Sequence, residues 1–556
     1  MIHFRRPALY RSLLAAAGWA VVCWVQFAWR LGYPSFWDPD EATYAETTRE
    51  MLASHSWFVP MYDGRPFFDK PPLFYLMQVA TFSVFGATEF AARLVPAISA
   101  GAMVVIVWWF GRHLFDRDTG RNGALMFAVL PATFALSSYA ILDMTFTMLL
   151  FGGCALLTVS AIEQRRVLQW PGYLLLALAV LTKGPLALVL SGLALIISLL
   201  LAPDARRVLL RLNWGVGLLL IAALSGPWFL YMWLRFGHAF VTGYVLRENL
   251  WLFSGSLYGA QRSILFYPKV IVVGLLPWTP LLIGRLFDAA RGDRIETAER
   301  LLWSWSIAVV GFFTLSGFKL DHYVFPAAPA LCLLCAAAWS RARSEGRRPV
   351  GTVAGLAAIP VILIAAGIVL IPGLDRVPLD LPAESRLLPI VLLASGLVML
   401  GQVGREWRAA PRPYIAVAGL LACYALVITI GLPAFEELKP TRRLARMVAT
   451  TAGANDQIGM FRLNRWSNSW RFYVGRHSER LETDADLHKF LATPGRHYCA
   501  MLRSQYDRLT AQGFRLRIVH EEKGLFTTTG RALRRGAAAR RDAFIVVTEE
   551  SGSAGA

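Results

Sequence analysis

The sequence predicts an α-helical membrane protein with many spans, ending in a small C-terminal α/β domain. Of its 556 residues, 56% are hydrophobic and 17% are charged, whereas a soluble domain is about half apolar and about a quarter charged. The mean hydropathy is +0.47, so lipid is the expected main solvent. After Pro433 the composition changes to that of a soluble protein.

Long apolar runs predict about 13 spans, because a span needs about 20 apolar residues and somewhat fewer where helices pack. The expected extents are 12–31, 90–110, 122–138, 141–162, 172–182, 184–202, 213–233, 265–284, 301–317, 323–340, 351–371, 386–402 and 413–432. Gly184 and Pro185 interrupt the run 174–201, which is either one kinked helix or two short ones.

Arginine placement predicts the orientation in the membrane. Arginines gather in every second loop, around residues 112–121, 165–166, 206–211, 285–300, 341–348 and 405–412. Cytoplasmic loops carry this excess, so we expect a cytoplasmic N-terminus. Residues 32–75, 234–268 and the tail then lie on the outer side of the membrane. The bias would invert if 174–201 were one pass, so it favours two passes.

The tail predicts a periplasmic α/β domain over residues 433–550. Helices are expected at 441–450 and from 486 to 491, and residues 551–556 are expected to be disordered. Short strands are expected at 457–461, 497–502, 516–520 and 543–548. Residues 1–432 form the expected membrane domain, with loops 32–75 and 234–268 building its site.

The net charge of +19 does not indicate nucleic-acid binding, because the arginines lie in short loops between apolar runs. Five of the six cysteines lie within apolar runs, so no disulfide framework is predicted.

The first outer loop places several acids just beyond the first span, among them Asp38, Asp40 and Glu41. A carboxylate at the bilayer surface is costly unless it is paired or functional, and it can act as a general base. The alternative is structural, since Asp38 or Asp40 could cap a helix running from Tyr44 to Leu52.

The same loop ends with Asp69-Lys70 before two prolines. An ammonium at headgroup level suits a lipid phosphate, although interfacial lysines that snorkel are common. Other outer turns carry lone charges too. They are Asp143, Lys183, and a third group of Lys319, Asp321, His322 and Tyr323. Carboxylates mixed with lone cations suit an anionic lipid headgroup and a sugar.

Several motifs resemble the membrane glycosyltransferases of the GT-C fold. They are Asp40-Glu41 with Tyr44-Ala45-Glu46, Asp69-Lys70-Pro71-Pro72, Leu181-Thr182-Lys183-Gly184-Pro185 and Lys319-Leu320-Asp321-His322-Tyr323. The resemblance is to the aminoarabinose transferases that modify lipid A and to the related protein O-mannosyltransferase-like family. That family also has 13 spans and a periplasmic C-terminal α/β domain.

The resemblance implies roles for individual residues. Asp40 is the implied catalytic carboxylate with Glu41 beside it, and Asp143 is a second acid of the site. Donor phosphate and sugar contacts are implied for Lys70, Lys183, Tyr323, Lys319 and Tyr44. Aminoarabinose transferases have Glu, linked to a metal, where this chain has Asp69, so a divalent cation is a candidate cofactor.

Two further departures weaken the transfer of donor and acceptor identity. Thr43 stands where those enzymes carry Arg, and Asp321-His322 replaces a usual Pro-Thr pair.

The expected activity is an inverting sugar transfer from a polyprenyl (undecaprenyl) phosphate. The expected acceptor is lipid A, with protein or another envelope glycan as alternatives. No phosphate-binding loop or nucleotide-binding glycine motif is found, which favours a lipid-linked donor. We expect a monomer. A lipid or solute transporter is the rival class, but no internal repeat is seen and the charges cluster at outer turns. A scaffold would leave the first-loop acids unexplained.

Overall fold

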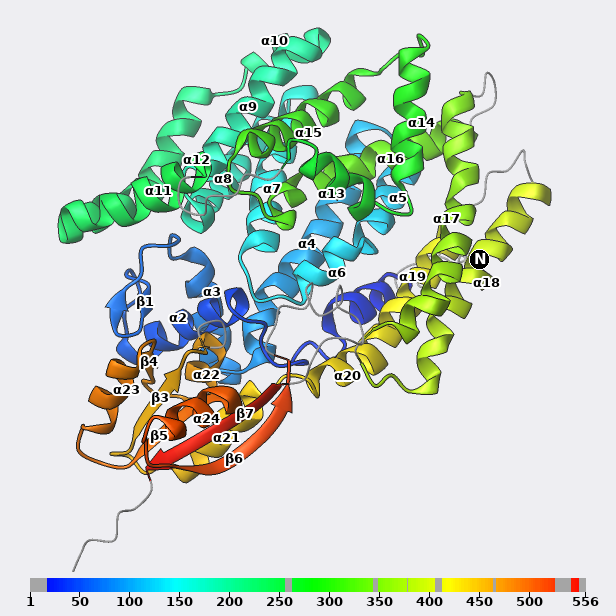
Figure 1. Cartoon of the computed structure of the whole chain (residues 1–556). Coiled ribbons are helices and arrows are strands. Elements are labelled where there is room, and N and C mark those ends of the chain that lie inside the picture. Colours follow the sequence, from blue (N-terminus) through cyan, green and yellow to red (C-terminus); the bar gives the residue numbers. More distant parts are fainter. Residues whose placement is uncertain are drawn as a thin grey trace, which may run out of the picture.

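The computed structural model describes residues 18–255, 263–343, 349–377, 379–405, 413–463, 467–525 and 542–549. Figure 1 shows a large helical part, a small sheet domain near the C-terminus, and the N-terminal helices α2 and α3 between them. The predicted 551–556 tail, part of the 234–268 loop and the start of the first span lie outside the described residues.

Seven helical segments within the described ranges are long and apolar enough to cross a membrane, or eight if a bent pair counts as one span. They are Glu89–Leu114, Asp143–Ile162, Trp214–Ser254, Asp321–Ala342, Val350–Asp375, Ala383–Gln402 and Tyr414–Glu436. Shorter apolar helices are Gly18–Ala28, Leu73–Phe85 and Leu186–Leu201. The chain is therefore a multi-pass membrane protein, while the count of 13 spans stays a prediction.

Most of this part is built from α-helices. They are α2 (Asp40–Ser54), α3 (Leu73–Phe85), α4 (Glu89–Leu114), α5 (Arg117–Ala128), α6 (Pro131–Ser137), α7 (Asp143–Ile162), α8 (Gln169–Lys183), α9 (Leu186–Leu201), α10 (Pro203–Leu210), α11 (Trp214–Phe240), α13 (Phe266–Gly274), α14 (Thr279–Ala290), α15 (Thr297–Leu315), α16 (Ala328–Arg343), α17 (Val350–Asp375), α18 (Leu387–Arg405) and α19 (Tyr414–Leu426). Two irregular helical segments matter for the site, η3 (Val241–Trp251) and η4 (Asp321–Ala327).

The run 174–201 forms two helices, α8 and α9. Gly184 ends α8 with φ +79°, a conformation that other residues rarely adopt. Pro185 follows and precedes α9.

Two spans predicted as single helices are broken. The 122–138 segment divides before Pro131 into α5 and α6. The 265–284 segment divides into α13 and α14, which are bent by 116°. Pro131 and Pro277 lie at these breaks, and a proline lacks the N–H needed to continue a helix.

The C-terminal domain carries a five-stranded sheet in the order β4-β3-β5-β7-β6. Strands β3 (Gln457–Phe461), β4 (Glu479–Leu481) and β5 (His497–Leu502) are parallel, while β7 (Asp542–Glu549) is antiparallel to β5 and to β6 (Leu516–Gly524). Its helices are α21 (Thr441–Thr451), α22 (Ser467–Val474), α23 (Asp484–Leu491) and α24 (Arg503–Ala511). The four predicted strands and two predicted helices are present. The sequence reading missed β4, α22 and α24.

One face of the sheet shares its core with the membrane part. Side chains of α21, α22 and the sheet pack in one buried cluster with Phe36, Phe82 and alanines of α2 and α4. The other face packs against α23 and α24. The domain is therefore seated on the first loop by apolar contact.

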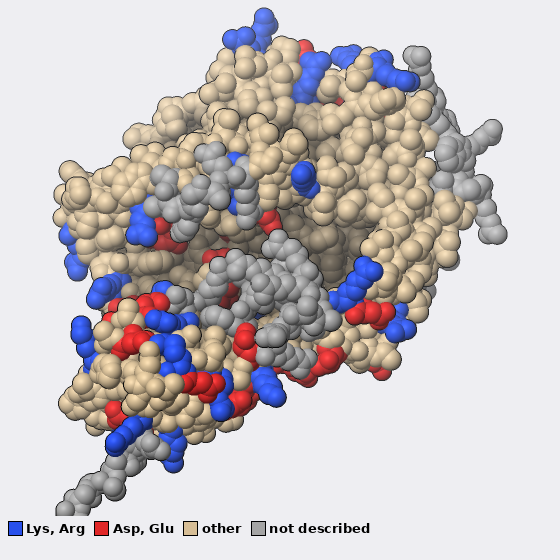
Figure 2. Space-filling model, in the orientation of Figure 1, with Lys and Arg blue, Asp and Glu red and all other residues tan. Residues whose placement is uncertain are grey.

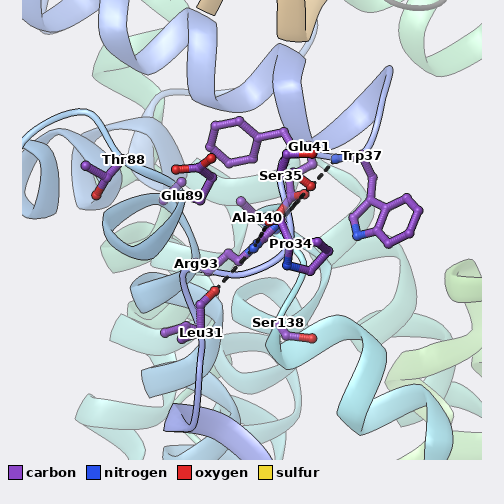
Figure 3. A network of polar contacts seen from close by, with 12 residues as sticks. Leu31, Pro34, Ser35, Trp37, Glu41, Thr88, Glu89, Arg93, Ser138 and Ala140 are labelled. Carbon is purple, nitrogen blue, oxygen red and sulfur yellow. Dashed lines mark hydrogen bonds and ion pairs between the residues drawn. The ribbon is translucent and has the colours of Figure 1, made fainter. Parts of the chain in front are cut away.

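A buried ion pair fixes the start of α2 (Figure 3). Arg93 on α4 donates Nε–H to Glu41 Oε1 at 2.6 Å and Nη2–H to Glu41 Oε2 at 2.8 Å. The Glu41 carboxylate also accepts the backbone N–H groups of Trp37 and Ala140, both at 2.9 Å. Arg93 donates further to the carbonyl of Pro34 at 2.7 Å. The first loop, α4 and the approach to α7 thus meet at Glu41.

Removing the arginine should destabilise the fold strongly. Arg93→Met leaves the buried Glu41 carboxylate without a cation, which costs about 3–5 kcal/mol of unfolding free energy. Adding Glu41→Gln removes the unpaired charge and should restore part of that loss. Thermal unfolding of the purified protein in detergent measures both. Arg503→Met, which breaks an exposed ion pair with Asp507, is the control, and an Arg93→Met midpoint no lower than the control contradicts the prediction.

A second contact joins the first loop to the C-terminal domain. Ser469 donates its backbone N–H to Asp38 at 3.0 Å and its hydroxyl to the same carboxylate. Lys439 donates to the carbonyls of Ser35 and Phe36 at 2.5 and 2.8 Å and lies over the ring of Trp37. Burial raises the pKa of Asp38 to about 7, against the opposing effect of Ser469 and Lys439.

This contact should make stability depend on pH. The raised pKa means that folded Asp38 keeps its proton where the unfolded carboxyl has lost it, so stability falls as pH rises from about 4 to about 7. We expect the melting midpoint of wild type to drop more between pH 5 and pH 8 than that of Asp38→Asn. Thermal unfolding of both proteins across this range measures the difference. Parallel curves would exclude Asp38 as the titrating group.

Candidate functional site

Charged side chains from four separate segments meet where the helical part faces the C-terminal domain. Lys70 precedes α3, Asp143 begins α7, Lys183 ends α8 and Glu248 lies in η3. The segments are distant in sequence, so the cluster exists only in the folded chain.

Lys70 is held between two carboxylates. Its Nζ lies 2.6 Å from Asp69 Oδ1 and 3.7 Å from Glu248 Oε2, and its side chain is 18% exposed. Burial alone would lower the pKa of Lys70, but the two acids raise it above its ordinary value. Burial likewise opposes ionisation of Asp69, yet Lys70 holds the pKa of that carboxyl below its usual range. Lys70 is therefore a charged, positioned ammonium and does not snorkel freely.

Lys183 forms the second cationic centre. Its Nζ lies 2.5 Å from Asp143 Oδ1 and sits over the rings of Phe146 and Tyr323, at 5.4 and 5.0 Å from their centroids. The aromatic faces and the carboxylate orient the ammonium in a partly dry setting, where its field is stronger than in water. Tyr323, in η4, thus lies at the site as a wall of the Lys183 position.

Asp40 lies in the first turn of α2, and its side chain is reached by solvent. The surrounding protein raises the pKa of Asp40 by burial, His322 and Lys70 oppose this, and Asp143 and Asp69 add to it. Asp40 is therefore within electrostatic reach of the same cluster. The helix-cap interpretation is wrong, because the cap position is Pro39, without a side-chain hydrogen bond, and Asp38 bonds Ser469 instead.

Three residues implied by the family resemblance do not take part in the ion pairs of this cluster. Glu41 is fully buried and both its oxygens are used by Arg93 and backbone N–H groups, so it is not free to act as a base. Lys319 is buried and donates to the carbonyl of Ser316. Tyr44 packs against Phe74 and Tyr75 with both centroids at 5.6 Å, as a wall residue.

A metal role for Asp69 stays a prediction. Its partners are Lys70 and the neighbouring Glu248, and no group of three His, Cys, Asp or Glu side chains gathers anywhere in the part of the chain that the structure describes. The Lys70 ammonium supplies one positive charge between these two carboxyl groups.

A cavity of about 1380 Å³ opens beside this cluster (Figure 2 shows the hollow between the helices and the C-terminal domain). Most of its wall is apolar, from α6, α13, α16 and the segment after α19. Acidic and basic side chains line it too, namely Asp38, Lys269, Asp321, His322, Lys439 and Arg462. Such a space fits an amphiphile with an anionic head. Neither this cavity nor the contact of Glu248 with Lys70 follows from a local motif, so neither could be predicted from the sequence.

The chain is similar to known membrane glycosyltransferases. The family model "Dolichyl-phosphate-mannose-protein mannosyltransferase" matches residues 69–233. An undecaprenyl phosphate-alpha-4-amino-4-deoxy-L-arabinose arabinosyl transferase of Sodalis glossinidius is 33% identical over 310 residues, which are 54% of this chain and 54% of the relative. An uncharacterized protein of Aquifex aeolicus is 30% identical over 319 residues, 56% of this chain and 61% of the relative. The chain thus spans somewhat more than half the length of these relatives.

The fold has a solved counterpart. The crystal structure of ArnT from Cupriavidus metallidurans bound to undecaprenyl phosphate matches with a TM-score of 0.76 at 21% identity, covering 99% of this chain and 100% of that one. The predicted fold class and the predicted resemblance are confirmed.

The turn that carries Lys183 should not tolerate a side chain at Gly184. A Cβ there would overlap the hydroxyl of Tyr244, and the positive φ adds roughly 1–2 kcal/mol. We expect Gly184→Ala to lower the thermal unfolding midpoint and Tyr244→Phe to rescue it in part, since the nearest ring carbon would then lie 3.2 Å away. Gly192→Ala on α9, where an added Cβ meets nothing within 4 Å, is the matched control. Equal midpoints for the two alanine variants would contradict the prediction.

Proposed function

We propose that this protein is an inner-membrane glycosyltransferase that moves a sugar from undecaprenyl phosphate to a lipid acceptor, namely lipid A. The single observation that carries this is the arrangement of Asp40 with two anchored lysines beside a large, mainly apolar cavity. The names of the arabinosyl transferase relatives support the choice of donor.

The lysines suit the donor. Lys70 and Lys183 come from different segments, and each is held by a carboxylate. A compact ammonium binds phosphate as a point charge, and two of them can stabilise the charge that grows on a departing polyprenyl phosphate. Asp143 takes the role of holding Lys183 in place.

The cavity suits the acceptor. Its apolar wall can take acyl chains, while Lys439, Arg462 and Lys269 offer cations to an anionic headgroup. Lipid A, with phosphates on an acylated sugar, has this chemistry. The mannosyltransferase family match over residues 69–233 keeps a protein acceptor as the alternative.

The proposed reaction is a single inverting displacement. An acceptor oxygen attacks the anomeric carbon, the bond from that carbon to the phosphate oxygen breaks, and polyprenyl phosphate leaves with the electron pair. Asp40 takes the proton where the acceptor oxygen carries one. Glu41 and Lys319 act in this proposal by supporting the fold.

The proposed orientation puts the site in the periplasm. Lys and Arg line the end of the molecule opposite the C-terminal domain (Figure 2), which is the pattern of cytoplasmic loops. Residues 1–432 are then the membrane catalytic domain and residues 433–550 a periplasmic domain that closes one side of the cavity.

The test is direct transfer by purified protein, with undecaprenyl-phosphate-linked 4-amino-4-deoxy-L-arabinose as donor and lipid A as acceptor, followed by mass spectrometry. Wild type should add one sugar to lipid A. Asp40→Asn should lower the rate about 10²–10⁴-fold, the usual contribution of a general base. Asp507→Asn, an exposed change on α24, is the matched control. No transfer by folded wild type would exclude this donor and acceptor pair, and an active Asp40→Asn would remove Asp40 from the mechanism.

A further inference from the structure

His322 occupies the border between the lysine cluster and the large cavity. It lies in η4 beside Tyr323, with the two rings at 89° and their centroids 5.2 Å apart. Its side chain is 24% exposed, and both His322 and Asp321 line the cavity. In the described part of the chain, neither ring nitrogen of His322 takes part in a hydrogen bond, so its polar edge is available to a ligand.

Asp143 connects this imidazole to the donor side. Asp143 Oδ1 is 2.5 Å from Lys183 Nζ, and Asp143 Oδ2 is 3.9 Å from His322 Nε2. One oxygen of the Asp143 carboxylate therefore contacts the Lys183 ammonium in the lysine cluster. The other oxygen lies near the His322 ring at the border of the cavity. A separation of 3.9 Å is too long for a hydrogen bond, so Asp143 does not occupy the ring nitrogen of His322.

The same imidazole also contributes to the electrostatic surroundings of Asp40. Among charged groups near Asp40, His322 has the largest effect, ahead of Asp143, Asp69 and Lys70. His322 thus lies between the carboxylate proposed as the base, the carboxylate that holds Lys183, and the space for the acceptor.

We propose that His322 is an acceptor-binding residue, whose imidazole contacts the anionic group of the acceptor and directs its attacking oxygen toward Asp40 and the donor. The inference rests on the proposed function and deepens it, because it assigns acceptor recognition to one side chain. Asp143 is then a positioning residue for both sides of the site. The acceptor class is a lipid with a phosphate at the reacting end.

A purely structural role is the competing explanation, because the ring packs on Tyr323. The two roles separate by substitution. His322→Phe keeps an aromatic ring against Tyr323 and removes both ring nitrogens. His322→Lys loses the ring and offers N–H donors to the anionic group of the acceptor.

The experiment measures KM for lipid A and for the sugar donor separately, together with lipid A binding in the absence of donor. We expect His322→Phe to raise KM for lipid A and weaken its binding about tenfold, which is the effect of losing one modest charged contact, with KM for the donor changed less than twofold. His322→Lys should recover most of the loss. His238→Gln, an exposed histidine on α11, is the control for histidine loss. Thermal unfolding reports whether each variant folds.

The outcomes are distinguishable. Unchanged KM for lipid A in folded His322→Phe overturns the assignment while leaving the proposed function intact. If both KM values rise equally, or if His322→Lys does not recover lipid A binding, the assignment is also overturned and a structural role is indicated. Wild type that neither binds lipid A nor transfers sugar to it overturns the proposed acceptor and, with it, the role of His322. Should His322→Phe fail to fold, His322→Leu gives the same readout, since it also removes both ring nitrogens and the side chain borders open space.

Discussion

The buried pair of Glu41 and Arg93 is the interaction on which the rest of the site depends. It joins the first loop, α4 and the segment before α7 through hydrogen bonds that use both carboxylate oxygens. Two ions taken from water are costly unless each is fully satisfied, so this geometry tolerates little displacement. The orientation of α2, and with it the direction in which Asp40 points, follows from this pair.

The C-terminal domain adds a second constraint. Its apolar face packs on the first loop and α4, while Lys439 and Ser469 bond to residues 35–38. The same contacts place Lys439 and Asp38 on the wall of the cavity. Docking of the domain therefore also builds one wall of the cavity. A change at this contact would alter both stability and the cavity.

Neighbouring acids in one motif have different surroundings in the folded protein. Asp38, Asp40 and Glu41 lie within four residues, yet one bonds the C-terminal domain, one faces the lysine cluster and one is buried against Arg93. Helical geometry separates the directions of Asp40 and Glu41 by about 100°. Which of the two side chains is buried depends on the residues of other segments that pack against the helix, such as Arg93. The motif could predict that an acid matters and could not predict which one is free.

By itself, the sequence determined the membrane character, four of the five strands of the C-terminal sheet, the division at Gly184-Pro185 and the residue types of the site. These follow from local properties, namely apolar run length, alternation and backbone restriction. Only the tertiary structure decided that Lys183 pairs with Asp143, that Glu248 joins Lys70, and that His322 borders a cavity closed by a domain more than 100 residues later. These depend on contacts between distant segments, and no local pattern records them.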